Sequence, residues 1–294
     1  MRILITGSAG YIGSALAERL KEHELVLVDN YSSLGDGRPV ISKIGKHEII
    51  RGDIINESFC KDITQSVDLI FHLAAISGIA KCEDPNSYES NITGLSILGR
   101  CAEQNDIKKI IFASSSAVYG EGQNPDITET HRIKPRSRYG NQKYVGELIL
   151  QSLKIPVVVF RKSNVYGHAL FHKKTAVDFF IDKALREEDL TIDGKGTQQR
   201  DYVNIHDVVD AYVQAMYWDS GVYNIGGLDN LSINDLADLV IKHAPKKVGK
   251  IYNSQGDAGR LLKNFTYNCK KANDNGYKPK RTVLEEIVQR FSNH

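Results

Sequence analysis

The sequence predicts an α/β protein built on a doubly wound parallel sheet, with a smaller mixed C-terminal domain. Short runs rich in Val, Ile and Leu alternate with amphipathic helical patterns from the first residue onward. These runs are apolar on both faces, which is typical of strands buried in a parallel sheet. A chain of 294 residues is also long enough to build a large sheet and a second body.

The elements follow in a regular order. Six strands are predicted, over Arg2–Thr6, Leu25–Asp29, His47–Arg51, Asp68–Leu73, Lys109–Ser114 and Val157–Phe160. Helical spacing between them predicts helices over Tyr11–Lys21, about residues 92–101 and about residues 145–153. Right-handed crossovers then give a parallel sheet covered on both sides, so we predict a Rossmann-type domain over residues 1–165.

After residue 165 the pattern becomes less regular. Val165–Lys174 and Asp193–Asp201 are polar or Gly-rich and long enough to form a binding rim. Helices are predicted near His206–Tyr217, Ile233–His243 and Thr282–Phe291, and short strands at Val222–Ile225 and Lys250–Asn253. We expect residues 166–294 to form a smaller substrate-binding domain, with 202–226 folding back onto the first domain.

The composition excludes several classes of protein. It is 41% hydrophobic and 25% charged, with 38 basic and 36 acidic residues, which argues against disorder and against electrostatic binding of nucleic acid or a membrane surface. No apolar run is long enough to span a membrane, and the N-terminal apolar run is too short for a signal peptide. Cys60, Cys82, Cys101 and Cys269 are scattered without metal-ligand spacing, so we expect reduced thiols in a cytoplasmic protein without a metal site.

A Gly-rich turn joins the first strand to the first helix at Thr6–Gly13. Glycines there let the backbone approach a pyrophosphate, and the helix start offers free N–H groups and its positive dipole end. Asp29 ends the second strand 22 residues after Gly7, and no Arg immediately flanks it. A carboxylate at that place accepts hydrogen bonds from ribose hydroxyls and repels a 2′-phosphate, which predicts NAD rather than NADP. The alternative is an ordinary tight turn without a ligand.

Tyr139 and Lys143 lie four residues apart at the start of a helical pattern, which puts both on one face. A nearby ammonium is expected to lower the phenol pKa toward neutrality, as a general base for a hydroxyl requires. Ser115 ends the fifth strand, where it can relay that proton. Tyr267 and Lys271 have the same spacing, but we expect this second pair to lie at the surface. A Tyr/Lys pair on a helix surface and a turn serine are the alternatives.

The glycine spacing TGxxGxxG resembles the short-chain dehydrogenase/reductase superfamily, specifically its extended branch of nucleotide-sugar epimerases and dehydratases. Further segments match that branch in order: Leu25–Ser33, Gly52–Ile54, His72–Ala75, Asn91, Ser114–Gly120, Tyr139–Lys143, Arg161–Gly167 and Gly194–Val203. The resemblance implies an NAD-dependent isomerase, closest to UDP-glucose 4-epimerases. Such an enzyme oxidises its UDP-hexose transiently to a 4-keto sugar and then returns the hydride.

The resemblance also implies roles for individual residues. The cofactor would be bound by Gly7, Gly10, Tyr11, Ile12, Asp29, Asn30, Asp53, Ile54, Leu73, Ala74, Ala75, Asn91, Tyr139 and Lys143. Ser115, Tyr139 and Lys143 would be catalytic. Ser115, Asn164 and Arg200 would bind the substrate, with Arg200 on its pyrophosphate.

One phosphate contact of the family is missing from the sequence. Family members usually carry a second phosphate-binding Arg before a Gly-Asp or Gly-Glu pair, whereas here Ser254-Gln255 precede Gly256-Asp257. Arg260 is the candidate substitute. His168, His172, Lys173 and Lys174, in the loop after the NVYG motif, are expected to be solvated.

Other functions remain open at this point. A nucleotide-sugar 4,6-dehydratase has the same fold, but that family has Asp then Glu directly after the catalytic Ser or Thr, and this chain has Ser116 and Ala117. A dehydrogenase acting on another small substrate is a third possibility. A redox-sensing NAD-binding protein is a fourth, although it has no need of a Ser-Tyr-Lys set. The resemblance further implies a homodimer formed by the helices near 86–105 and 138–153.

Overall fold

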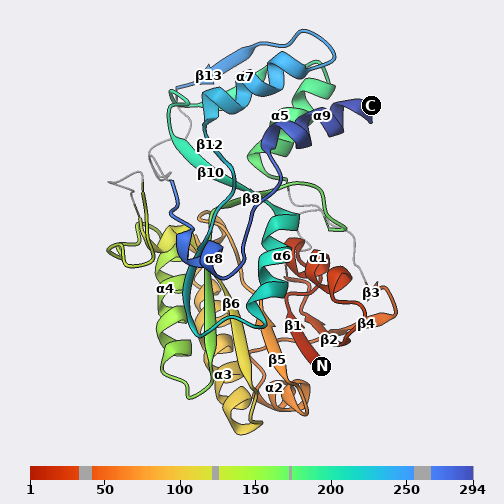
Figure 1. The fold of residues 1–294 in the computed structure, drawn as a ribbon, viewed down its shortest axis with the longest axis vertical. Coiled ribbons are helices and arrows are strands. Elements are labelled where there is room, and N and C mark those ends of the chain that lie inside the picture. Colours follow the sequence, from red (N-terminus) through yellow and green to blue (C-terminus); the bar gives the residue numbers. More distant parts are fainter. Residues whose placement is uncertain (33–41, 121–125, 172–173, 255–265, 294) are drawn as a thin grey trace.

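The computed structural model describes residues 1–32, 42–120, 126–171, 174–254 and 266–293 (Figure 1). His172, Lys173, Gly256, Asp257 and Arg260, which the sequence analysis singled out, lie outside these ranges. Figure 1 shows a larger body containing the N-terminus and a smaller one containing the C-terminus, joined by strands that run between them.

The larger body is built on an eight-stranded sheet whose strands are parallel except for the edge strand β3. In spatial order the strands are β11 (Gly221–Ile225), β7 (Val157–Lys162), β6 (Lys109–Ser115), β5 (Leu69–His72), β1 (Arg2–Thr6), β2 (Glu24–Asp29), β4 (His47–Arg51) and β3 (Lys43–Ile44). The predicted α/β fold with a doubly wound parallel sheet is confirmed. All six predicted strands are present, with ends that differ by at most two residues.

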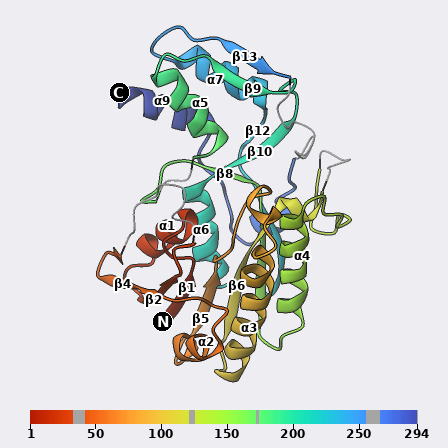
Figure 2. The same ribbon diagram turned by 180° about the vertical axis from the view of Figure 1, so that it is seen from behind.

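Helices cover both faces of this sheet, because each strand is apolar on both sides. On one face, α1 (Tyr11–Arg19) and α6 (Ile205–Ala215) bury Leu16 and Tyr212 against strand residues such as Phe160. On the other, α2 (Glu57–Thr64), α3 (Gly94–Gln104) and α4 (Arg138–Gln151) pack on the alternate residues of the same strands (Figure 2). The prediction missed α2, whose start is fixed by the Asn56 side chain accepting from the Phe59 N–H.

In the described residues, the smaller body combines two short sheets with three helices. One sheet has the order β12 (Asp229–Ser232), β10 (Gln199–Asn204), β8 (Asn164–Tyr166), and the other pairs β13 (Lys250–Asn253) with β9 (Leu190–Asp193). The helices are α5 (Ala176–Leu185), α7 (Ile233–His243) and α9 (Val283–Ser292). Each begins with a capping box, in which the N-cap hydroxyl and an acidic side chain three residues later each accept a hydrogen bond from the other residue's backbone N–H. The segment expected as an irregular rim at 193–201 instead ends in strand β10.

The chain passes between the two bodies more than once. After β10 in the smaller body, it forms α6 on α1 and then β11 at the edge of the large sheet, and the short helix α8 (Lys270–Asp274) later packs on β11. In the part of the chain that is described, no helix combines the length and the apolar run that a bilayer crossing demands.

Candidate functional site

The Gly-rich turn after β1 is closely packed against the neighbouring strand end. Gly7 adopts a φ of +73°, and a Cβ on it would lie 2.6 Å from the Ala74 backbone nitrogen. A Cβ on Gly13 would lie 2.0 Å from the Gly7 carbonyl oxygen, so α1 can approach the turn only with glycine there. The glycines therefore keep the start of α1 close to the carboxyl end of β1.

The start of α1 has the properties of an anion site. No side chain caps the helix at Gly10, and its first turn contains no acidic residue. Ser8 is fully buried, and its Oγ has no hydrogen-bond partner among the described residues. Uncapped N–H groups, the positive end of the helix dipole and an unsatisfied hydroxyl together fit the pyrophosphate of a dinucleotide. Tyr11 donates its hydroxyl to the Gly167 carbonyl, which ties this helix start to the loop after β8.

The Asp29 carboxylate lies directly beside this turn. It accepts hydrogen bonds from the Ala9 N–H at 3.0 Å and the Tyr31 N–H at 2.7 Å. Asn30 Nδ2 donates to Asp53 Oδ2 at 2.7 Å, so the predicted residues at the ends of β2 and β4 form one cluster. Arg51 is paired with Asp29 across these strands, a neighbour that local sequence does not reveal.

The end of β5 and α4 are connected through Asn91. The Leu73 N–H donates to the Thr6 carbonyl at 3.1 Å, which holds the start of the segment 73–75 against the Gly-rich turn. Asn91 lies in a π-helical turn, Glu89–Thr93, a geometry frequent at functional sites. It bonds both backbone groups of Ile76, at 2.8 and 2.9 Å, and donates to Gln142 Oε1 at 2.6 Å. Asn91 therefore supports the segment after β5 and helix α4 together.

Ser115, Tyr139 and Lys143 gather at the carboxyl end of β6. Helix α4 starts one residue before Tyr139 because the Ser137 side chain caps it, accepting from the Gly140 N–H at 3.1 Å. Ser115 is hydrogen-bonded to the Tyr139 hydroxyl. The Lys143 Nζ lies 6.0 Å from the centre of the Tyr139 ring. Lys143 is only 5% exposed.

The expected lowering of the Tyr139 pKa is wrong for the protein without ligands. Burial raises the pKa of Tyr139 to about 12, although the hydrogen bond with Ser115 opposes this. Burial also lowers the pKa of Lys143 to about 8. Desolvation disfavours the charged form of each group, the phenolate of Tyr139 and the ammonium of Lys143.

A buried ion pair fixes the helix that carries this set. Glu147, one turn after Lys143, forms a 2.6 Å ion pair with Arg161 of β7, and both side chains are at most 5% exposed. Glu147 also accepts from the Ser114 hydroxyl, while Arg161 donates to the Tyr119 hydroxyl at 3.0 Å. Removing one partner would leave the other charge buried, so the pair holds α4 in place against β6 and β7.

Two of the three predicted substrate residues, Asn164 and Arg200, lie in strands of the smaller body. Arg200 in β10 is 8% exposed, and its Nη1 donates to the Gln199 carbonyl at 3.0 Å. Its Nη2 is buried without a hydrogen-bond partner among the described residues. Asn164 in β8 is exposed and donates to the Asp201 carbonyl at 3.1 Å. Arg200 therefore has an unsatisfied donor suited to an anion.

In the second Tyr/Lys pair, Lys271 lies at the surface as expected, but Tyr267 is buried. Tyr267 is only 8% exposed and packs edge-on against Tyr119, with ring centres 6.1 Å apart. Lys271 is exposed and donates to the Val222 carbonyl. Because α8 starts only at Lys270, the two residues do not share a helix face, and the spacing alone was misleading.

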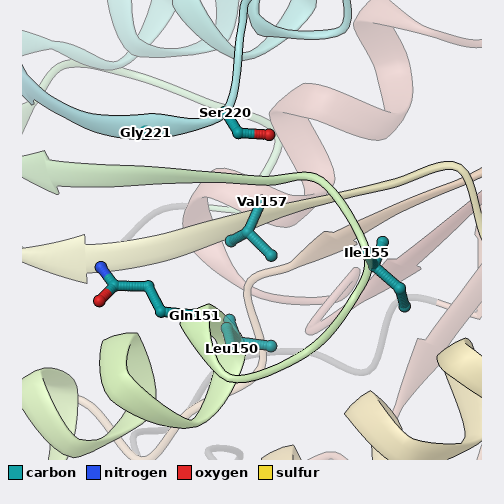
Figure 3. Close-up of a pocket in the computed structure, with 6 residues that line it drawn as sticks. All are labelled: Leu150, Gln151, Ile155, Val157, Ser220 and Gly221. Carbon is teal, nitrogen blue, oxygen red and sulfur yellow. The ribbon is translucent and has the colours of Figure 1, made fainter.

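A hollow at the opposite end of the strands is separate from the candidate site. It is lined by Leu150, Gln151, Ile155, Val157, Ser220 and Gly221 (Figure 3). Val157 and Gly221 begin β7 and β11, so the hollow lies at the amino ends of these strands. Ligands of open α/β sheets bind at the carboxyl ends.

Comparison with known proteins gives concordant matches. Residues 3–226 match the model of the NAD dependent epimerase/dehydratase family. A putative UDP-glucose 4-epimerase of Methanocaldococcus jannaschii is 33% identical, covering 97% of this chain and 95% of the relative. The crystal structure of UDP-glucose 4-epimerase with UDP-glucose from Thermotoga maritima superposes with a TM-score of 0.85 at 30% identity, covering 99% and 98% of the two chains. UDP-glucuronic acid 4-epimerase from Bacillus cereus, in complex with UDP-glucuronic acid and NAD, gives a TM-score of 0.85 at 27% identity with the same coverage.

Proposed function

The chain belongs to the NAD-dependent epimerase/dehydratase family, and from this we propose that it is a UDP-hexose 4-epimerase that interconverts UDP-glucose and UDP-galactose. When bound, NAD supplies a hydride acceptor that later returns the hydride to the other face of the sugar. The Gly7–Gly13 turn and Asp29 are the residues proposed to hold it. The protein's own groups bind, orient and deprotonate the sugar.

In this proposal Tyr139 removes the proton of the 4-hydroxyl and Ser115 relays it. Ser115 already bonds the Tyr139 hydroxyl, so a sugar oxygen between them completes the path. A phenol with a pKa of about 12 is almost entirely protonated at neutral pH, so little of the phenolate that must accept the proton is present. We infer that Lys143 approaches the Tyr139 hydroxyl in the loaded enzyme, where its charge stabilises the phenolate. Catalytic hydrogen bonds commonly tighten in this way on substrate binding.

Arg200 is proposed to bind the substrate diphosphate. Its buried and unsatisfied Nη2 supports this role, because a phosphate oxygen would supply the missing acceptor and an opposite charge. Asn164 is exposed nearby and is proposed to contact the nucleotide sugar.

The residues that follow Ser115 carry the choice of epimerase over dehydratase. Elimination of the 6-hydroxyl needs an acid and a further base, and Ser116 and Ala117 occupy the two positions where dehydratases carry acidic residues. A serine pKa is too high for that acid, and alanine takes no proton. Return of the hydride is then the only productive fate of the 4-keto sugar.

The test is NMR of UDP-, dTDP- and GDP-hexoses after incubation with the purified protein. We expect UDP-galactose to be converted to UDP-glucose with no net NADH and no 4-keto-6-deoxy product. Tyr139→Phe is the inactive control, and Tyr217→Phe, at a tyrosine that is 80% exposed, is the matched active one. Accumulation of a keto-deoxy sugar from any of these substrates would refute the epimerase assignment.

The proposal extends to a cytoplasmic homodimer, with residues 1–165 as the cofactor domain and 166–294 as the substrate domain. Helix α4 leaves Val145 and Leu148 39% and 47% exposed, and Tyr88 near α3 is 44% exposed. These apolar groups support pairing through the helices near 86–105 and 138–153. Light scattering should give a dimer mass, and Leu148→Glu should give a monomer.

A further inference from the structure

A second lysine is buried beside Ser115 and Lys143. Lys162 ends β7, is 8% exposed and is paired in register with Ser115 of β6. Its Nζ donates to the Ser114 carbonyl at 2.9 Å and lies 5.9 Å from the centre of the Tyr212 ring. Among the described residues, none places a carboxylate within ion-pair distance of this amine.

This environment is costly for an amine. An ammonium has three N–H donors, and only one acceptor is present in the described part of the chain. Burial and the charge of Lys143 lower the pKa of Lys162 well below its ordinary value. A methionine would fill the same space without this penalty, so the position favours a role for the amine itself.

Tyr212 adds a second unsatisfied group at the same place. It is fully buried on α6, and its hydroxyl has no hydrogen-bond partner among the described residues. Burial raises its pKa, and the proximity of Tyr139 raises it further. An amine with one acceptor for its three donors and a hydroxyl without a partner among the described residues therefore lie next to the Ser115–Tyr139–Lys143 set, on the face of the sheet covered by α1 and α6.

We propose that Lys162 contacts the nicotinamide end of the bound cofactor and favours its reduced form. This rests on the proposed function, in which the hydride acceptor must meet the carbon whose hydroxyl is held by Ser115 and Tyr139. Adjacent strands lie about 4.8 Å apart, so the residue paired with Ser115 borders that position. The amide group of a nicotinamide also offers a carbonyl oxygen as the acceptor that Lys162 lacks.

Charge explains the preference for the reduced form. The oxidised ring carries a positive charge that the reduced ring does not, so a nearby ammonium opposes the first and tolerates the second. An amine that is neutral beside the oxidised ring and gains a proton on reduction acts in the same direction. Oxidation of an alcohol releases one hydride, taken by the cofactor, and one proton. Tyr139 accepts that proton in the proposed function, and Lys162 acts through its charge on the cofactor.

The experiment measures cofactor preference without any sugar. Wild-type protein, Lys162→Met and Lys162→Gln are each equilibrated with a mixture of NAD and NADH of known ratio and then desalted. The amounts of bound NAD and NADH are measured after the protein is denatured, and thermal melting curves show whether each variant is folded. The matched control is Lys109→Met, because the Lys109 amine also binds only backbone carbonyls, of Met216 and Trp218, but lies at the other end of β6.

We expect the bound ratio of NADH to NAD to fall about tenfold in both Lys162 variants, the order expected for one charge several ångströms away, and to be unchanged in Lys109→Met. An unchanged ratio in folded Lys162 variants would overturn the proposal, as would loss of the melting transition in both, which would make Lys162 a structural residue. Failure of the protein to epimerise any sugar would refute the proposed function and leave this ratio unaffected.

Discussion

Replacing Arg200 by methionine should affect stability and ligand binding in opposite directions. In the free protein the guanidinium is buried, its Nη2 has no partner among the described residues, and burial lowers its pKa. Methionine keeps an unbranched apolar stem in the same space and removes the unsatisfied donor. We therefore expect the sugar-free protein to become more stable, while the affinity for UDP falls.

The magnitudes follow from the contacts. An unsatisfied buried donor costs about 1–3 kcal/mol, and the Nη1 bond to Gln199 is lost in exchange, so the free energy of unfolding should rise by about 1 kcal/mol. A charge-assisted contact to a phosphate contributes about 2–3 kcal/mol, which corresponds to a loss of roughly 30- to 150-fold in UDP affinity. Urea unfolding without UDP gives the first quantity, and isothermal titration calorimetry gives the second.

Arg290→Met is the matched control, because the guanidinium of Arg290 is ion-paired with carboxylates, whereas Arg200 has no ion pair among the described residues. The Arg290 Nη1 lies 3.0 Å from the fully buried carboxylate of Asp178. Removing the guanidinium should lower the free energy of unfolding by about 3–5 kcal/mol, because it leaves the Asp178 carboxylate buried without this partner, and should leave UDP binding unchanged. UDP affinity unchanged in Arg200→Met, or a loss of stability matching that of Arg290→Met, would refute the reasoning.

Three further predictions follow. Tyr139→Phe should lower the epimerisation rate by about 10²–10⁴-fold with little change in UDP affinity, since it removes the proton-accepting oxygen and keeps the ring. A rate within about threefold of the wild-type rate would contradict this. Asp29→Ala should lower the amount of NAD that the purified protein releases on denaturation, and release of NADP instead from the wild type would contradict the role of this carboxylate. Burial raises the pKa of Asp201 from 3.8 to about 6, so the native state holds this proton more tightly than the unfolded chain does. The free energy of unfolding should therefore fall by up to about 3 kcal/mol as the pH rises from about 4 to 6. Asp201→Asn should flatten this part of a plot of the free energy of unfolding, measured with urea, against pH.

Periodicity predicted the large sheet and, in the smaller body, α7, β13 and α9, but it missed α5, β8, β9 and β12. The strands of the large sheet are apolar on both faces, so each is visible as a short hydrophobic run between turn residues. Helix α5 was not predicted although its capping box, Thr175 with Asp178, is a local signal. Only the first half of strand β10, which includes Arg200 and Asp201, was assigned to a rim, because residues 193–201 are polar or Gly-rich. Arg200 and Asp201 are buried at the junction of the two bodies, a setting that depends on segments distant in the sequence.

The candidate site shows the same division between local and distant information. The Gly-rich turn and the Tyr139–Lys143 spacing are local, and both occur where such motifs were expected. The burial that raises the Tyr139 pKa comes from packing of other elements, so no local pattern signals it. Lys162 was missed because a lysine after an apolar strand usually marks the surface. Only the pairing of β7 with β6 places it beside Ser115.

The position of β11 has a consequence for synthesis on the ribosome. The large sheet is completed by a strand, β11, that is made only after the chain has left β7 at Lys162 and built part of the smaller body, from β8 to β10. Until α6 and β11 emerge, Phe160 and its neighbours on that face lack their cover. We therefore expect a nascent chain ending near residue 165 to remain sensitive to protease and to bind chaperones, whereas one that extends past Ile225 should acquire a resistant core.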